Sequence, residues 1–411
     1  MMEMGMRILL INATYEIGST GRNCKEILDE LERQGEQGYI AFSQGKLPNN
    51  GYCIGGKLEK KLHALLSRVL GLQGYFSTHG TRKFLKYLDA VQPDIIHINN
   101  VHANFLNLNM LYDYIQKKRI PVVMNLHDCW SYTGKCCHYT QVGCDRWQSG
   151  CHDCPKLKQE NVSWFFDRTL KMWKDKRDNY EKIPSLYVVG VSDWITNEAQ
   201  KSILKSAKRL VRIYNWVDLE CIPSVKQMDC KKEKGVEGKF VILGVASRWD
   251  ESKGLSRFIE LADLLDDDSR IVLIGAHDGK EEKNSKIIWI PPVLEMEELM
   301  RYYIMADAFV TMSYEESFGK VSAEALACGT PVVCFDSTAN AEVVGSGCGH
   351  VVKKGDMEGL YAALEKIRRQ GKEYYSQSCC QYVADNFNRC RNVNQYIKLY
   401  KEIIEEKQHE K

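Results

Sequence analysis

The chain alternates short apolar runs with longer amphipathic stretches. In the first half, apolar runs of strand length occupy residues 7–12, 39–43, 93–99, 121–128 and 186–192. Between them lie stretches with the 3.6-residue periodicity of a helix, including NCKEILDELERQG after the first run and a helix predicted near 163–181. Strand followed by helix followed by strand is the pattern of a parallel α/β sheet.

The second half repeats this pattern after a polar stretch at 219–238, which we interpret as a linker. Apolar runs resume at 240–247, 270–276, 286–290, 309–313 and 331–335. The pattern predicts an N-terminal domain over 1–218, a second domain over 219–390, and an amphipathic C-terminal helix over 391–411 that packs back on the body.

Each predicted domain is an α/β, Rossmann-like, doubly wound parallel sheet. Ligands of such sheets bind beyond the carboxyl ends of the strands. Two such sheets facing each other would form a cleft, which is where we expect the substrates.

Composition and charge narrow the function. A length of 411 residues suits two domains, and 44% hydrophobic with 27% charged residues is ordinary for a globular protein. A net charge of +2 gives no reason to expect nucleic acid as a partner. The sequence has no apolar run of about 18 residues, and its start does not resemble a signal peptide, so we expect a cytoplasmic protein.

The segment EESFGKVSAEALACGTPVV places acidic residues around a predicted helix start. Glu316 precedes the helix, and the main-chain amides of Phe318 and Gly319 carry the positive end of its dipole. Glu324 lies two turns along the helix, placed for another part of an extended ligand. Carboxylates and amides of this kind bind sugar hydroxyls. Two glutamates alone would equally complement the helix dipole or face solvent, and Glu315 is interpreted as a surface residue.

Arg248 and Lys253 share the loop that follows the first strand of the second half. An arginine fork and a lysine charge suit a diphosphate, and they also stabilise negative charge on a leaving nucleotide. Taken alone, a basic pair in a loop is usually solvated.

Several loops of the first half end in residues with ligand-binding chemistry. Gly18, in GSTG after the first strand, lets a backbone come close to a ligand. Four polar residues fall at or beyond the carboxyl ends of later strands, namely His97, His102, His127 and Asp128.

Glu316 and Glu324 are separated by seven residues, with Phe-Gly between them and ALACGTPVV around and after the second. This segment resembles the E-x7-E element of the family 4 retaining glycosyltransferases, which have the GT-B fold. RWDESKGL, PDIIHINNVH and the LHDCW-TG-Cys run extend the resemblance over most of the chain, and the subgroup is similar to bacterial capsular and exopolysaccharide (colanic-acid-like) enzymes.

The resemblance implies roles for individual residues. Glu316 and the following residues Ser317, Phe318, Gly319 and Lys320 would hold the donor sugar, and Glu324 the nucleotide ribose. Arg248 and Lys253 would bind the donor diphosphate, which the loop at Gly18 approaches. His127 would touch the donor sugar near the reacting carbon. Apart from the resemblance, we expect His97, His102 and Asp128 to line the acceptor side, because they fall at or beyond the carboxyl ends of strands.

The implied reaction is transfer of a sugar from a nucleotide-diphosphate donor to a glycan hydroxyl, with retention at the anomeric carbon and no catalytic metal. The acceptor is expected to be lipid-linked and to belong to surface polysaccharide biosynthesis. A sugar epimerase or phosphorylase with the same fold, or a catalytically silent zinc-stapled adaptor, is the alternative.

Sixteen cysteines are many, and five of them lie in TGKCCHYTQVGCDRWQSGCHDCP, within an insertion at 129–155. Cys151 and Cys154 form a knuckle of the type that binds zinc. We predict a structural zinc ion held by Cys136, Cys144, Cys151 and Cys154. Cys137 or His138 would be alternatives to Cys136, and free buried thiols or disulfides are the other interpretations.

A basic helical region precedes these motifs. Its cations are Lys57, Lys60, Lys61, Arg68, Arg82, Lys83 and Lys86. They would suit peripheral contact with the anionic inner face of a cell membrane, although a solvated face explains them equally well.

Overall fold

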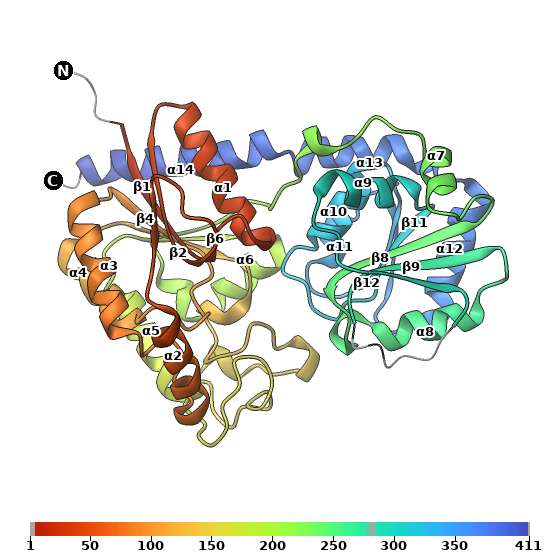
Figure 1. Cartoon of the computed structure of the whole chain (residues 1–411). Helices are drawn as coiled ribbons and strands as arrows, with labels where there is room; N and C mark the ends of the chain where they lie inside the picture. Colours follow the sequence, from red (N-terminus) through yellow and green to blue (C-terminus); the bar gives the residue numbers. More distant parts are fainter. Residues whose placement is uncertain (1–4, 278, 280–283, 410–411) are drawn as a thin grey trace. The chain divides into compact units, whose positions relative to one another are not determined.

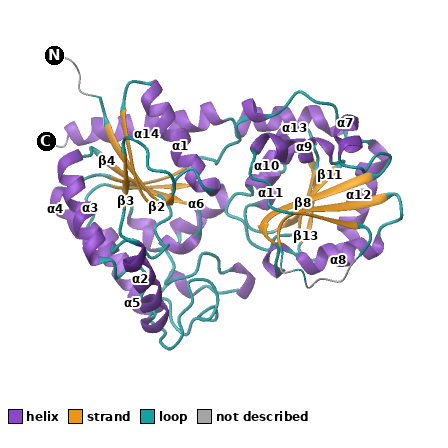
Figure 2. Ribbon diagram, in the orientation of Figure 1, coloured by secondary structure: helices purple, strands orange, loops and turns teal. Residues whose placement is uncertain are grey.

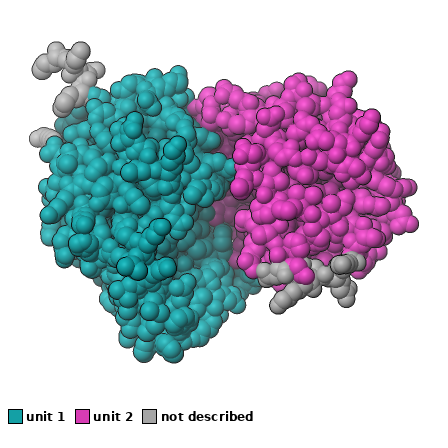
Figure 3. Space-filling view, in the orientation of Figure 1, with its two compact units in different colours: residues 1–213, 393–411 teal, residues 214–392 magenta. Residues whose placement is uncertain are grey.

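The computed structural model describes residues 5–277, 279 and 284–409 and forms two compact units (Figure 3). Unit 1 comprises residues 1–213 and 393–411, and unit 2 comprises residues 214–392. The division falls after Ile213, whereas the sequence placed it after residue 218. The reason is that residues 214–218 bond to residues 387–389 of unit 2: Val217 N donates to Phe387 O at 2.8 Å, and Arg389 pairs with Asp218 at 2.8 Å.

Unit 1 contains a seven-stranded parallel sheet in the order β3-β2-β1-β4-β5-β6-β7, with helices on both faces (Figure 2). Its regular elements are β1 (Arg7–Thr14), α1 (Gly18–Arg33), β2 (Gln37–Gln44), β3 (Gly51–Cys53), α2 (Lys57–Leu70), α3 (Thr78–Val91), β4 (Ile95–Ile98), α4 (Leu108–Lys118), β5 (Val122–Leu126), α5 (Thr169–Glu181), β6 (Leu186–Gly190), α6 (Asp193–Gln200) and β7 (Arg209–Arg212). Every residue of β4, β5 and β6 is buried, because helices cover both faces of a parallel sheet.

The segment from Cys129 to Arg168 has no regular helix or strand beyond three short 3₁₀ turns: η1 (Cys129–Ser131), η2 (Thr140–Val142) and η3 (Arg146–Gln148). It has an aromatic core of its own. Trp147 is buried, with ring centroids 5.2 Å from Tyr132 and 4.9 Å from Tyr139. Trp173 of α5 donates its indole N–H to Trp147 O at 2.7 Å, which ties the segment to the body of unit 1.

The long C-terminal helix α14 (Arg389–His409) packs along unit 1 (Figure 1). Glu402 and Glu406 pair with Arg209 and Lys208 at 2.7 and 2.8 Å. Tyr400 makes a 2.6 Å hydrogen bond with His97 Nδ1 on β4.

The predicted acceptor role of His97 is wrong. Its side chain is fully buried, bonded to Tyr400 and stacked at 5.5 Å on Tyr396. On β4 it points to the sheet face that α14 covers, so it contributes to the core beneath that helix.

Unit 2 contains a six-stranded parallel sheet in the order β10-β9-β8-β11-β12-β13. Its elements are η5 (Leu219–Cys221), α7 (Gln227–Glu233), β8 (Phe240–Arg248), η6 (Glu251–Lys253), α8 (Leu255–Leu264), β9 (Ser269–Ala276), β10 (Ile287–Ile290), α9 (Met296–Met305), β11 (Ala308–Thr311), α10 (Lys320–Ala327), β12 (Val332–Asp336), α11 (Asn340–Val343), β13 (Gly349–Lys353), α12 (Met357–Gln370) and α13 (Glu373–Asn386).

The stretch predicted as a linker contains α7 and belongs to unit 2. Asp307 explains why a polar helix docks there. Its carboxylate accepts from Lys231 Nζ at 2.6 Å, from Gln227 Nε2 at 2.9 Å and from the main-chain N–H of Val241 at 2.6 Å. The polar residues of this stretch therefore make specific contacts with the unit.

The strand orders mark where ligands bind. In each unit the first strands are added on one side of the initial strand and the later strands on its other side. The order reverses between β1 and β4 in unit 1 and between β8 and β11 in unit 2. Doubly wound sheets bind ligands outside the carboxyl ends of the strands at this switch point. In unit 2, β8 leads to the loop of Lys253 and β11 leads to the loop of Glu316.

No helix within the described part of the chain combines the length and the apolar character that crossing a bilayer requires.

We predict that acidification destabilises the contact between β4 and α14. Burial lowers the pKa of His97 to about 3, and in the unfolded chain histidine titrates near pH ~6.5. The unfolded state therefore binds one more proton between these two values, and stability falls as the pH drops through that window. Wild type should lose up to about 1.4 kcal/mol per pH unit more than His97→Gln in urea unfolding between pH 6 and 4.

His79→Gln is the matched control, because His79 is exposed on α3. Its unfolding free energy should have the pH dependence of wild type. A His97→Gln variant with an unchanged pH dependence would contradict the buried neutral imidazole.

Candidate active site and cysteine-rich cavity

The loops that follow β8, β11 and β12 are hydrogen-bonded to one another. Ser252 O accepts from Tyr314 N at 3.2 Å and from Ser313 Oγ at 3.4 Å. Ser313 O in turn accepts from Ser337 Oγ at 2.9 Å and from Asn340 Nδ2 at 3.1 Å. Three loops from neighbouring strands therefore form one assembly at the carboxyl edge of the unit 2 sheet.

Lys253 and Glu316 meet in this assembly. Asp250 accepts from the main-chain N–H groups of Ser252 and Lys253, at 2.8 and 3.3 Å, and so caps the turn that carries the lysine. Lys253 Nζ then donates to Glu316 Oε1 at 2.6 Å. Burial lowers the pKa of Lys253, but the Glu316 carboxylate more than offsets it, so the pKa is raised and the lysine stays charged. The two side chains are 32% and 20% exposed, so the pair is open to a ligand from solvent.

Arg248 lies at the exposed end of β8, beyond an irregularity in the pairing with β9 between Val245 and Arg248. The next residue, Trp249, is buried and donates its indole N–H to Ile274 O at 3.1 Å. The buried tryptophan anchors the chain on one side of Arg248, and Lys253 follows in the next turn.

The start of α10 has the features of a binding site for hydroxyl groups. Gly319 has a φ of +90°, which favours glycine, and no described residue accepts a hydrogen bond from the main-chain N–H of Phe318 or Gly319. Around it, Ser317 Oγ, Ser322 Oγ and Asn340 Oδ1 are buried without a hydrogen-bond partner. Buried polar atoms are normally satisfied, so these three atoms point to a ligand.

Sequence reasoning missed Ser322 and Asn340. A Cβ at Gly319 would lie 3.8 Å from Ser322 Oγ and 3.6 Å from Asn340 Oδ1, which shows how closely both flank that glycine. Asn340 is the first residue of α11, which follows β12, and only the strand order brings it to the start of α10. Phe318 itself is buried against Phe387, at 5.2 Å between ring centroids, so only its main chain is available to a ligand.

The acidic residues of this segment differ in their surroundings. Glu316 is fixed through its main chain, since its N–H donates to Thr338 Oγ1 at 2.8 Å. Glu324 is 4% exposed and accepts from the Tyr303 hydroxyl at 3.0 Å, so it is not a solvated residue. The prediction that Glu315 lies on the surface is wrong: it is 7% exposed, because its loop folds inward, where Ser313 Oγ donates to Glu315 O at 3.2 Å.

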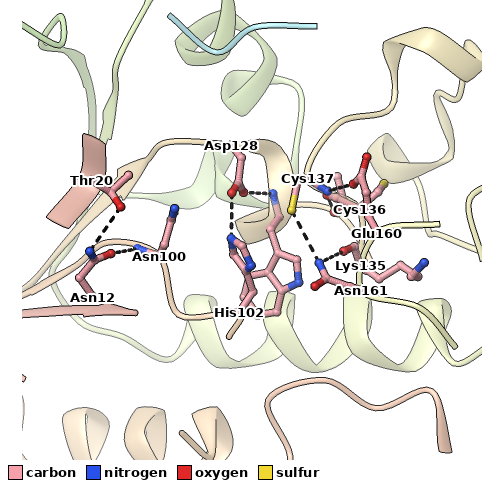
Figure 4. A network of polar contacts seen from close by, with 12 residues as sticks. Asn12, Thr20, Asn100, His102, Asp128, Lys135, Cys136, Cys137, Glu160 and Asn161 are labelled. Carbon is pink, nitrogen blue, oxygen red and sulfur yellow. Dashed lines mark hydrogen bonds and ion pairs between the residues drawn. The ribbon is translucent and has the colours of Figure 1, made fainter. Parts of the chain in front are cut away.

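In unit 1 the loops after β1 and β4 are also joined (Figure 4). Asn12 donates to Thr14 O at 2.7 Å and to Thr20 Oγ1 at 3.3 Å, and accepts from Asn100 N at 3.0 Å. Gly18 begins α1 with a φ of +67°, is exposed, and has open space where a Cβ would stand. Sequence reasoning singled out Gly18 but missed Asn12, which orders both loops.

His127 follows β5 and is partly buried. Its Nε2 lies 3.0 Å from Asn99 Oδ1 and 3.2 Å from Asn125 Nδ2. Asn99 directly follows β4, and Asn125 lies within β5. The two asparagines therefore orient the imidazole at the carboxyl edge of the sheet.

His102 and Asp128 form a pair, with Nε2 2.9 Å from Oδ2 (Figure 4). Burial raises the pKa of Asp128, but His102 lowers it by more, so that the pKa of Asp128 is about 2. Burial lowers the pKa of His102, but Asp128 more than offsets this, so that the pKa of His102 is raised. Cys137 joins them: the three ligand atoms lie within 4.8 Å of one another, and no other set of three or more potential metal ligands among the described residues is gathered this closely.

The four predicted zinc ligands line one cavity of about 20 Å³, together with Tyr139 and Trp147. Cys137 and His138 do not line it. Gly134 N donates to Cys151 Sγ at 3.1 Å, and a Cβ on Gly134 would lie 2.9 Å from Cys151 Cβ, so the TG-x-C turn requires this glycine. The four sulfur atoms are not all within 4.8 Å of one another, and a metal ion would have to draw them together.

Three lysines are buried around the cysteines. Lys135 Nζ donates to the carbonyls of Lys156 and Gln159 at 2.6 and 2.8 Å, and Lys156 pairs with Glu160. Lys176 Nζ lies 3.3 Å from the centre of the Trp130 ring, and burial lowers its pKa to about 7. Burial also raises the pKa of Cys136 and of Cys151 to about 12.

We predict that Gly254→Ala destabilises unit 2 and disturbs the turn of Lys253. Gly254 has a φ of +75°, and an added Cβ would lie 2.7 Å from Met312 O. A positive φ costs an alanine about 1–2 kcal/mol, and the contact adds to it. The free energy of unfolding, measured in urea, should fall by about 3 kcal/mol.

Gly238→Ala is the control, since Gly238 has a φ of +74° and nothing within 4 Å of the added Cβ. Its free energy of unfolding should fall only by about 1–2 kcal/mol, which is what a positive φ costs an alanine. Equal losses in the two variants would show that the contact of Gly254 with Met312 is unimportant.

Comparison with known proteins identifies relatives over both units. A family model described as Glycosyltransferase Family 4 matches residues 22–221, and one described as Glycosyl transferases group 1 matches residues 227–378. A putative colanic acid biosynthesis glycosyl transferase, WcaC of Escherichia coli, is 24% identical over 64% of this chain and 64% of its own length. An uncharacterized protein of the cps region of Klebsiella pneumoniae is 24% identical over 77% of this chain and 81% of its own.

Solved structures share the fold. Sucrose-phosphate synthase from Thermosynechococcus elongatus superposes with a TM-score of 0.69 at 16% identity, covering 97% of this chain and 99% of that one. HepE of Anabaena, in complex with UDP and glucose, superposes with a TM-score of 0.68 at 15% identity, covering 97% and 100%. The two parallel-sheet units are thus those of the GT-B fold, and the chain belongs to the family 4 glycosyltransferases.

Proposed function

We propose that this protein transfers a sugar from a nucleotide-diphosphate donor to a hydroxyl of a glycan acceptor, with retention at the anomeric carbon. The observation that carries the proposal is the Lys253–Glu316 pair at the switch point of the unit 2 sheet. Colanic acid biosynthesis in the name of one relative and the cps region of another support a role in surface polysaccharide biosynthesis.

In this proposal the donor lies across the assembled loops of unit 2. Lys253 and Arg248 face the diphosphate and stabilise the negative charge that develops on the leaving nucleotide. Glu316 and the amides of Phe318 and Gly319 bind hydroxyls of the transferred sugar. Glu324, beside Tyr303, binds the ribose. HepE of Anabaena has also been solved in complex with UDP-glucose, which supports a nucleotide sugar as the class of donor.

The reaction follows from this placement. The bond between the anomeric carbon and the diphosphate oxygen breaks, and a bond from the acceptor oxygen forms on the same face of the sugar. The leaving phosphate takes the acceptor proton, so no side-chain base is needed. Because the two cations supply the positive charge, we propose that catalysis needs no metal. From unit 1, His127 would contact the donor sugar and Gly18 would admit the diphosphate, with His102 and Asp128 on the acceptor side.

Turnover of the donor tests this function. Lys253→Ala and Glu316→Gln should each lower the rate of nucleotide release from a UDP-, GDP- or ADP-sugar by 100-fold or more, because each removes a contact to developing charge or to the sugar. Lys239→Ala is the control: Lys239 pairs with Asp268 at 3.1 Å just before β8, at the opposite end of the same strand. It should retain the wild-type rate.

The same assay separates the alternatives. Retention would appear in the anomeric NMR signals of the product. Epimerised donor without acceptor would indicate an epimerase, and glycan breakdown driven by free phosphate a phosphorylase. The absence of turnover and of any thermal shift with a panel of nucleotide sugars would leave the silent adaptor as the better description.

We propose further that Cys136, Cys144, Cys151 and Cys154 hold a structural zinc ion. The shared cavity and the N–H bond to Cys151 fit a closed thiolate site, and Lys135, Lys156 and Lys176 would offset the charge of the thiolates. Four protein ligands leave no open position, so the ion would stabilise a segment that has no regular secondary structure.

Metal analysis tests the ligand set. Purified wild type should contain about one zinc ion per chain, and Cys136→Ser and Cys144→Ser should lose it and melt at lower temperature. Cys137→Ser is the control, since Cys137 lies with His102 and Asp128. Zinc lost from Cys137→Ser but kept in Cys136→Ser would reverse the assignment of the fourth ligand.

The acceptor class completes the proposal. A lipid-linked glycan would bring the enzyme to the inner face of the cell membrane from the cytoplasm, by peripheral contact with anionic lipid.

A further inference from the structure

Unit 1 exposes an unusual amount of apolar surface on α2. Leu58, Leu62 and Leu65 are 82%, 55% and 46% exposed, although a helix in a globular protein normally turns such residues inward. Their spacing of four and three residues places them on one face of the helix. The face directed into the protein is occupied by other residues, such as the buried His63 and Ser67. The exposed leucines therefore lie on the face of α2 opposite to the one that packs against the protein.

A second apolar group lies at the end of α2, although it is about a hundred residues away in the sequence. Trp164, Phe165 and Phe166 are 43%, 68% and 45% exposed. The main chain of this loop is fixed: Trp164 N donates to Arg68 O at 2.6 Å, and Ser163 Oγ donates to Phe166 O at 2.6 Å. The loop is thus fastened to the carboxyl end of α2 while its three aromatic side chains face outward.

Most charged residues around this surface are cations; the exposed acid beside the aromatic loop, Asp167, is bonded to the main-chain N–H groups of Cys154 and Thr169. Lys57, Lys61 and Arg68 are exposed on α2, and Arg168 lies 5.4 Å from the Phe166 ring. The single acid of α2, Glu59, is directed inward, where its carboxylate accepts from Gly80 N at 3.0 and 3.1 Å at the start of α3. Exposed leucine and aromatic side chains bordered by lysine and arginine are typical of segments that lie in a membrane interface.

We propose that α2 and the loop Trp164–Phe166 form a docking surface for an anionic bilayer. Leucine and aromatic side chains would enter the boundary of headgroups and acyl chains, while the cations would contact lipid phosphates. A second copy of the chain fits this surface less well, because a two-fold contact would bring the same cations together. The inference rests on the proposed function, since it identifies the surface by which the proposed lipid-linked acceptor would be reached. It adds exposed leucine and aromatic side chains to the basic region noted in the sequence.

Sedimentation with vesicles tests the docking surface. Wild type should bind vesicles of phosphatidylcholine mixed equally with phosphatidylglycerol and should bind phosphatidylcholine alone weakly. Added salt should weaken binding, since exposed charges are screened. Leu58→Ser/Leu62→Ser and Phe165→Ser/Phe166→Ser should each lower the partition coefficient by tenfold or more. Lys57→Glu/Lys61→Glu, which keeps the apolar side chains, should do the same.

Leu294→Ser/Met228→Ser is the matched control, because these residues are 84% and 60% exposed in unit 2. It should bind vesicles as wild type does. Melting temperatures of all variants should remain within a few degrees of wild type, as expected for exposed positions.

Three results would overturn the inference: no vesicle binding by wild type, equal loss in the control, or a dimer in sedimentation velocity that the docking variants dissociate. Donor hydrolysis in solution separates this outcome from failure of the transferase proposal. Docking variants should retain it, whereas Lys253→Ala should lose it and still bind vesicles.

Discussion

The hydrogen bonds that join the loops after β8, β11 and β12 are the constraint on which the site of unit 2 depends. Ser252 and Ser313 offer their carbonyls to groups from neighbouring loops, and this brings Lys253 to within 2.6 Å of Glu316. This ion pair is partly buried, since its side chains are 32% and 20% exposed. It remains assembled because the main chain around it is fixed, and it is thereby available to exchange its internal bond for bonds to a ligand.

The same edge of the sheet carries polar atoms that the protein itself leaves unsatisfied. Ser317, Ser322 and Asn340 each have a buried side-chain oxygen without a partner around the start of α10. Such atoms cost stability, and their place beside free amides of a helix start is consistent with a ligand that has many hydroxyls. In unit 1, Asn12 accepts from Asn100 N and His102 pairs with Asp128, while Asn99 Nδ2 and Asn125 Oδ1 are buried without a partner among the described residues.

Two features of unit 1 lie outside its parallel sheet. The segment from Cys129 to Arg168 replaces regular structure with an aromatic core, buried lysines and a cavity lined by cysteines. Its far end presents three exposed aromatic side chains beside α2. The cysteine-rich segment therefore links the cavity to an apolar surface. Ser163 Oγ donates to Phe166 O within the aromatic loop, and Trp164 N donates to Arg68 O of α2.

The alternation of apolar runs was enough to predict two parallel α/β units, because burial on both faces makes a central strand continuously apolar whatever the rest of the fold. The sequence also pointed to Lys253, Glu316 and Glu324, because the succession of elements along the chain places each of them after a predicted strand.

The succession of elements along the chain did not reveal which strands are neighbours in the sheets. Strand order brings Asn340 to Gly319, while the packing of helices and loops covers His97 with α14, turns Glu315 inward and places Trp164 beside Arg68. These contacts join residues far apart in the chain, so only the tertiary structure could decide them.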